Sequence, residues 1–306
     1  LRIRTPIGAD AGSLELATGA ARVSASGELL AAVPATQPLS GLVEVPVIRV
    51  DEAGPVEVSR VAVVGPVADV VLLNEVLYVA GQQLYMFDLS DPTVPVPSPP
   101  VDLFTGSRLL GLVEADGYLH ALGATASAQR LKTVSLASPL APVEVGGTAV
   151  DLAAVPRVRL QGIGGWLYRH GVGRIEQWAL SGGAMPALAG SASLGSTNVT
   201  DLELVGGQLS AAIAGSGTRL VNQSGSSISW GPAPARAETA VALAAIPDGG
   251  EDRLFRVAGL GGLKRDGPQE LLQIASRCFL RDVTRMPNGR LLMLTDCGID
   301  VREVLP

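Results

Sequence analysis

Charged residues are scarce in this 306-residue chain: Asp, Glu, Lys and Arg together make up only 17% of it. The basic residues are nearly all Arg, since Lys132 and Lys264 are the only lysines, and the formal net charge is −6. Nucleic-acid-binding surfaces gather Lys and Arg on one face, and the sequence shows no such cluster. We therefore expect no nucleic-acid partner.

Long apolar runs are lacking too, although 47% of the residues are hydrophobic. A membrane-spanning helix needs about 18 consecutive apolar residues without turn formers, so no membrane span is predicted. The chain opens LRIRTPIGAD, with neither an initiator Met nor a basic-then-apolar leader. That opening is expected of a processed or trimmed product, whose export signal or anchor would lie outside this sequence.

Histidine is almost absent, with only His120 and His170, and no GxSxG motif occurs. A Ser–His–Asp triad needs a histidine that reaches a nucleophile, and the sequence offers no such set. The residues therefore do not favour an enzyme, although they leave one open. They likewise predict no tightly bound organic cofactor.

Glycine and proline are abundant, at 37 and 21 residues, which is the profile of many short strands joined by turns. Stretches such as LYVAGQQLYMF (77–87) alternate apolar and other residues with period two. This period indicates half-buried strands. We therefore predict an all-β protein.

Short segments of the chain recur at a regular spacing. FDLSDPTVP (87–95), VSLASPLAP (134–142) and WALSGGAMP (178–186) share an apolar start, a central Leu, turn formers and a final Pro. A second column places Asp before an alternating strand, with spacings of 82, 50 and 81 residues, at Asp69, Asp151, Asp201 and Asp282. Two of these spacings are close to twice the length of one unit.

Four strands in each unit of about 40 to 50 residues indicate a propeller blade, a small sheet whose faces neighbouring blades must cover. We predict one seven-bladed β-propeller over residues 1–306, although six or eight blades also fit the weaker boundaries. An N-terminal strand should pair with the last blade and close the ring. The predicted blades span 21–65, 66–106, 107–147, 148–196, 197–240, 241–281, and 282–306 together with 1–17.

The run LYVAGQQLYMFDLSDPTVP (77–95), preceded by DVVLLNEV (69–76), resembles the LVIVD repeat of bacterial and archaeal propellers. The resemblance is good in one unit and recognisable in two or three more. It implies an exported or cell-surface bacterial protein, placed extracellularly or in the periplasm. It implies little about activity.

The Asp column has two interpretations. Each carboxylate at the start of an innermost strand can accept hydrogen bonds from backbone N–H groups and tie one blade to the next. Alternatively, Asp69, Asp151, Asp201 and Asp282 form a partial ring that binds Ca²⁺ or another hard cation in the central channel. The first interpretation is preferred, and Ca²⁺ remains the one candidate cofactor.

A group of aromatic and basic side chains occurs in WLYRHGVGR, where we predict a loop tip at the rim of the longest blade. Loops that the scaffold does not need often carry binding residues. The candidate binding residues are Trp166, Tyr168, Arg169, His170 and Arg174. The alternative is an aromatic plug that packs on its own blade.

The two cysteines, Cys278 and Cys297, lie 19 positions apart. A disulfide between them is favoured for an exported protein and would contribute on the order of 3 kcal/mol. Two buried free thiols are the alternative. Metal or redox chemistry lacks support from a CxxC pair or a neighbouring His.

Three functions are compatible with these features. The preferred one is a non-catalytic interaction module whose rim loops bind a protein or glycan of the cell envelope. The second is a propeller hydrolase or lyase that uses channel carboxylates and a bound cation. The third is a structural module of a larger surface assembly.

Overall fold

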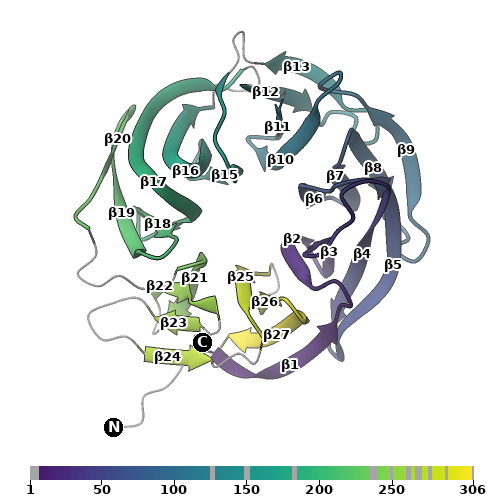
Figure 1. Ribbon diagram of the computed structural model, residues 1–306. Coiled ribbons are helices and arrows are strands. Elements are labelled where there is room, and N and C mark those ends of the chain that lie inside the picture. The colour runs from purple at the N-terminus through teal and green to yellow at the C-terminus, as the bar shows by residue number, and fades with distance from the viewer. Residues whose placement is uncertain are drawn as a thin grey trace.

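The computed structural model describes residues 7–124, 128–147, 152–180, 185–233, 240–248, 251–259, 263–265, 271–274, 278–286 and 289–304. Antiparallel strands in these ranges form small sheets that stand radially around a central axis (Figure 1). The protein is thus an all-β propeller, as the repeat predicts. Among the described residues, no helix has the length and apolar character needed to cross a bilayer.

The first half of the chain forms three sheets. The first contains β2 (Ala20–Ser26), β3 (Leu29–Pro34), β4 (Leu42–Asp51) and β5 (Gly54–Val64). The second contains β6 (Asp69–Leu73), β7 (Val76–Ala80), β8 (Leu84–Asp88) and β9 (Val96–Val101). The third contains β10 (Arg108–Ala115), β11 (Tyr118–Ala124), β12 (Ala128–Ser135) and β13 (Val143–Gly147), with β14 (Leu152–Ala153) paired to β12.

The second half also forms three sheets. The largest contains β15 (Arg159–Ile163), β16 (Trp166–Ala179), β17 (Ala187–Val205), β18 (Gln208–Ile213), β19 (Gly217–Ser224) and β20 (Ser227–Trp230). The next contains β21 (Ala242–Asp248), β22 (Glu251–Val257), β23 (Leu263–Arg265) and β24 (Leu271–Ile274). The last contains β25 (Leu280–Arg285), β26 (Leu291–Thr295), β27 (Gly298–Val304) and β1 (Ile7–Glu15).

The described residues form six sheets, so the preferred count of seven blades is wrong, and the count is the six that the weaker boundaries also allowed. The difference arises in β17, which is 19 residues long. Its first part pairs with β16, and its second part, from Val199, pairs with β18. The predicted boundary between Ser196 and Thr197 lies inside this strand, where the backbone continues without a turn. One six-stranded sheet therefore takes the place of two predicted blades.

The hydrophobic core lies between neighbouring sheets, and β7 shows why. All five residues of β7 are buried. Leu77 and Val79 pack toward the first sheet, in a cluster that includes Val45 and Val61. Tyr78 and Ala80 point the other way, toward Leu119 and Ala121 of the third sheet. Because side chains alternate along a strand, each face of this sheet is covered by a different neighbour.

The two ends of the chain close the ring, as the sequence predicts. β1 pairs antiparallel with β27, and Leu14 lies opposite Ile299. The Leu16 N–H group then donates to the Cys297 carbonyl oxygen at 3.1 Å. Figure 1 shows β1 as the outer strand beside β27, before the chain turns inward to β2.

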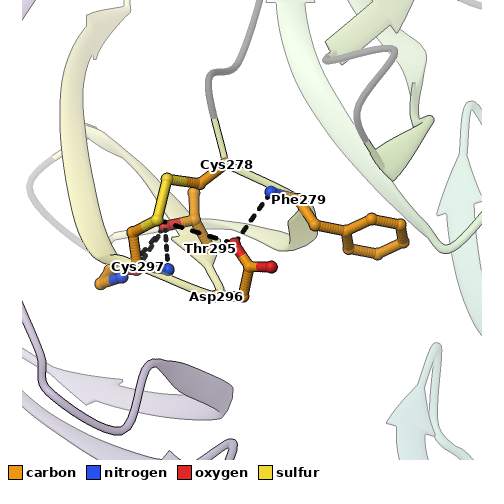
Figure 2. Close-up of a disulfide and its surroundings, with 6 residues drawn as sticks. Cys278, Phe279, Thr295, Asp296 and Cys297 are labelled. Carbon is orange, nitrogen blue, oxygen red and sulfur yellow. Dashed lines mark hydrogen bonds between the residues drawn. A yellow bond between two sulfur atoms is a disulfide. The ribbon is translucent and has the colours of Figure 1, made fainter.

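A disulfide joins Cys278 and Cys297, with 6.0 Å between their Cα atoms. It connects the segment before β25 to the turn between β26 and β27 (Figure 2). The Phe279 N–H donates to the Asp296 carboxylate at 2.9 Å. The Thr295 hydroxyl oxygen accepts the Gly298 N–H at 3.0 Å. The disulfide thus staples the sheet that closes the ring.

Replacing both cysteines by serine should lower the free energy of unfolding by about 3 kcal/mol, because the closed loop of roughly 20 residues restricts the unfolded chain. Urea unfolding of Cys278→Ser/Cys297→Ser measures the loss. A reducing agent should weaken the wild-type protein similarly and leave the double variant unchanged. Equal urea midpoints for the oxidised wild type and the variant would contradict this role.

Candidate functional site

The innermost strands are tied to one another by side-chain oxygens that accept backbone N–H groups of the next strand around the axis. Asp69 Oδ2 accepts the Leu112 N–H at 3.2 Å, and Asp201 Oδ2 accepts the Leu243 N–H at 2.8 Å. Two uncharged side chains act in the same way. Gln161 Oε1 accepts the Leu202 N–H at 3.0 Å, and Ser24 Oγ accepts the Leu72 N–H at 2.8 Å. The structural interpretation therefore holds for Asp69 and Asp201.

The other two members of the Asp column differ. Among the described residues, Asp282 accepts only the N–H of its own neighbour Val283, at 2.8 Å. Asp151 lies outside the described residues. Within the predicted blade 148–196 the innermost described strand is β15, which begins at Arg159 and pairs that residue with His170, as Asp69 pairs with Ala80. A basic residue thus stands where the column predicts an acidic one.

Inner strands line an open cavity of about 390 Å³ on the axis. Its wall comes from β2, β6, β10, β15 and β25, which surround the central opening in Figure 1. The polar lining includes Arg22, Ser24, Asp69, Arg159, Gln161 and Asp282. Sequence reasoning missed both arginines because the column was defined by Asp alone. The strand–turn–strand pattern of RLQGIGGWLYRH could have indicated that Arg159 begins an inner strand.

Charge in the cavity is mixed and partly compensated. Arg22 Nη1 donates to Asp69 Oδ2 at 2.9 Å. Burial lowers the pKa of Arg22, although the charge of Asp69 opposes this effect. Burial, and then the negative charge of Asp201, raise the pKa of Asp282 to about 7. Burial and then the charge of Asp201 likewise raise the pKa of Glu203 to about 8.

The described carboxylates do not converge on a metal-sized point. In the part of the chain that the structure describes, the one group of three close ligand atoms comprises Cys278, Asp296 and Cys297. The two sulfur atoms of that group are already joined in the disulfide. Asp69 and Asp201 use their oxygens to tie strands together. The Ca²⁺ ring therefore has no described ligand set to support it.

The predicted rim cluster lies in strand β16 and not in a loop tip, so that placement is wrong. Tyr168, Arg169 and His170 are each at most 2% exposed. The turn comes earlier, at Gly164 and Gly165, whose positive φ angles of 58° and 79° favour glycine. The chain has already entered the strand when it reaches the aromatic and basic residues.

The side chains of this cluster have partners inside the protein. Arg169 makes a two-pronged ion pair with Glu176 at 2.7 and 2.8 Å, and Arg174 binds the same carboxylate at 2.9 Å. The ring nitrogens of His170 lie 3.0 Å from the Val199 carbonyl oxygen and 2.6 Å from Gln161 Oε1. Burial lowers the pKa of His170 to about 3.

The two remaining contacts of the cluster are also internal. Tyr168 accepts a short hydrogen bond from the Gln223 side chain. Trp166 is partly buried against the core that contains Tyr168. These residues pack the fold, and a macromolecular partner could not reach the three buried ones.

A different rim segment is exposed. The loop between β3 and β4 carries Leu39, which is 95% exposed, and leads into Leu42, which is 67% exposed. Beside it lies a groove of about 340 Å³. Its lining includes Leu16, Pro34, Pro38, Leu42, Pro46 and the ion-paired Arg60. Sequence reasoning missed this site because a single Leu among turn formers has no distinctive pattern.

The comparisons with known proteins show the fold alone. No family model and no curated protein sequence matches this chain, so the LVIVD resemblance stays a prediction. Sqt1 of Chaetomium thermophilum has a TM-score of 0.67 at 9% identity, over 97% of this chain and 98% of that chain. The WD40 β-propeller domain of Doa1 has a TM-score of 0.65 at 13% identity, over 98% and 97%. The computationally designed Ika8 protein has a TM-score of 0.62 at 9% identity, over 97% and 100%.

Lowering the pH from 8 to 5 should increase the stability that Asp282 contributes. Its pKa is about 7 in the folded protein and about 4 in an unfolded chain. The folded state therefore binds more protons in this window, and stability falls as the pH rises. Urea unfolding at pH 5 to 8 should show that Asp282→Asn weakens this pH dependence, by on the order of 1 kcal/mol.

Glu52→Gln serves as the control for this experiment, because Glu52 is an exposed carboxylate in the turn between β4 and β5. It should leave the pH dependence of unfolding as it is in the wild type. The assignment fails if Asp282→Asn and Glu52→Gln change that dependence equally.

Proposed function

We propose that this chain is a non-catalytic interaction module of an exported or cell-surface bacterial protein, and that it binds a partner of the cell envelope through the rim loop that carries Leu39. The observation that carries the proposal is this one side chain, which is almost fully exposed on a loop whose backbone is held in place. The propeller fold supports it, since propellers commonly present binding loops on a rigid scaffold.

The loop is anchored on both sides of Leu39. Before it, the Thr36 N–H donates to the Thr18 carbonyl oxygen at 3.1 Å. The Gln37 amide bridges to the next blade, where its nitrogen donates to the Val67 carbonyl and its oxygen accepts the Val67 N–H, at 2.9 and 2.7 Å. After it, the Gly65 N–H donates to the Gly41 carbonyl at 2.9 Å. The loop would therefore lose little conformational entropy when a partner binds to it.

The chemistry of the surface favours a protein over a glycan. The groove beside Leu39 is lined mostly by proline, leucine, alanine and valine residues, together with two threonines and the charged Glu44 and Arg60. An apolar centre with a charged rim is typical of protein interfaces. Burying one exposed Leu contributes about 1.5–3 kcal/mol, so Leu39 can serve as an anchor residue.

The disulfide supports an extracellular, cell-surface or periplasmic location. Disulfides persist in oxidising compartments and are rare in the cytosol, where thiols are kept reduced. Cys278 and Cys297 staple the sheet that closes the ring, so an oxidising environment would stabilise the whole propeller. A partner of the cell envelope would be accessible to the protein in the same compartment.

Cross-linking in the native host tests the binding surface. A photo-reactive phenylalanine analogue at position 39 should give one discrete protein adduct, and the same analogue at Val94 should not. Val94 is a suitable control because it is 63% exposed in the loop between β8 and β9. Leu42→Ser should reduce the yield of the adduct at position 39 about tenfold, as expected for the loss of an anchoring Leu. Identical adducts from positions 39 and 94 would refute the proposed surface.

The location can be tested separately. If the protein is exported, rapid acid quenching of host cells followed by thiol alkylation and mass spectrometry should find Cys278 and Cys297 unlabelled until a reductant is added. Both thiols should label in cells grown with a permeant reductant. Free, labelled cysteines in untreated cells would argue for a reducing compartment instead.

A further inference from the structure

Two opposite charges in the central cavity have no ion-pair partner. Arg159 extends from β15 and Asp282 from β25, and both line the cavity. Among the described residues, neither forms an ion pair within 4.0 Å. These two strands lie on different sides of the central opening in Figure 1.

The other polar groups of the cavity are already used by the fold. Arg22 is paired with Asp69, which also accepts the Leu112 N–H. Gln161 Nε2 donates to Asp201 at 2.7 Å, and the Gln161 oxygen accepts the Leu202 N–H. These bonds tie strands together, as described above. Glu114 also lines the cavity and accepts the Gly117 N–H with one oxygen. Arg159 and Asp282 Oδ2, for which the described residues show no hydrogen bond, are therefore the groups best placed to meet a molecule in the cavity.

The two free charges cannot satisfy one another directly. They line one cavity, yet no ion pair forms between them within 4.0 Å. Burial and then the charge of Asp201 raise the pKa of Asp282, and the more distant charges of Arg159 and Arg22 only partly oppose this effect. A partly desolvated charge gains free energy from a charged hydrogen-bonding partner. Each end of the cavity would thus be stabilised by a group of the opposite sign.

We propose that the central cavity binds a small zwitterion, whose carboxylate pairs with Arg159 and whose ammonium group pairs with Asp282. A free α-amino acid has this chemistry. The guanidinium fork of arginine matches a carboxylate in a bidentate manner, and a carboxylate accepts N–H donors of an ammonium group. The cavity volume of about 390 Å³ lies at the small end of the range for ligand pockets, about 300–1,000 Å³.

Ligands with a single charge fit less well. Two arginines and three acidic residues line the cavity: Arg22, Arg159, Asp69, Glu114 and Asp282. An inorganic anion at Arg159 would also meet the surrounding carboxylates, and a simple cation at Asp282 would also meet the arginines. A zwitterion has no net charge and compensates both free groups at once.

Thermal unfolding of the intact chain with each of the twenty L-amino acids at millimolar concentration tests the proposal. At least one should raise the melting temperature, and calorimetric titration then measures its affinity. The N-acetyl derivative and the methyl ester of that amino acid each lack one charge and should bind at least tenfold more weakly. Arg159→Gln and Asp282→Asn should each weaken binding of the parent amino acid at least tenfold. Arg49→Gln and Glu52→Gln, which change exposed charges on β4 and its following turn, should not.

Circular dichroism checks that each variant is folded, and Arg159→Lys provides a second variant that keeps the positive charge. Arg159→Lys should bind more weakly than the wild type and more tightly than Arg159→Gln, because lysine keeps the charge but loses the fork. The proposal is overturned if no amino acid stabilises the protein. It is also overturned if the capped derivatives bind as well as the parent, or if acetate or ammonium alone gives the same stabilisation. None of these outcomes depends on the surface around Leu39.

Discussion

A small twisted sheet with two apolar faces is not stable alone in water, so every sheet of this protein depends on a neighbour on each side. The strand β7 shows the constraint most clearly, because its alternate side chains enter two different cores. A row of such sheets would leave one apolar face uncovered at each end. Closing the row into a ring removes both ends, and the pairing of β1 with β27 achieves this. The disulfide in the same sheet reinforces the junction on which the ring depends.

The second constraint acts on polar groups near the axis. Buried backbone N–H groups of the innermost strands need acceptors, and side chains of the neighbouring strand supply them. Asp69 and Asp201 are used in this way, and Gln161 does the same without a charge. Carboxylates around a propeller axis can therefore be structural, even where their alignment suggests a metal ring. What remains after these bonds are counted is a mixed-charge cavity with Arg159 and Asp282 still available.

The two proposed binding regions use different parts of the fold. The rim surface depends on a loop between β3 and β4, which can vary because no sheet pairing passes through it. The central cavity is formed by the innermost strands, whose positions are set by the packing of the sheets. A change in the rim loop would leave the cavity intact, and the reverse also holds. The protein could thus respond to a small molecule and to a macromolecular partner through separate residues.

The sequence by itself determined the features that depend on short-range pattern. Period-two alternation and turn formers predicted the all-β class, and the leftover strands at the two ends predicted that β1 would join the last sheet. The favoured pairing of Cys278 with Cys297 agrees with the structure. Only the tertiary structure decided that β17 continues through a predicted boundary, that Arg159 takes a place on the axis, and that Tyr168, Arg169 and His170 are buried. Only the tertiary structure showed that Leu39 is exposed to solvent. The physical reason is that burial and charge pairing are set by neighbouring sheets about 40 or more residues away in the chain, which local pattern does not encode.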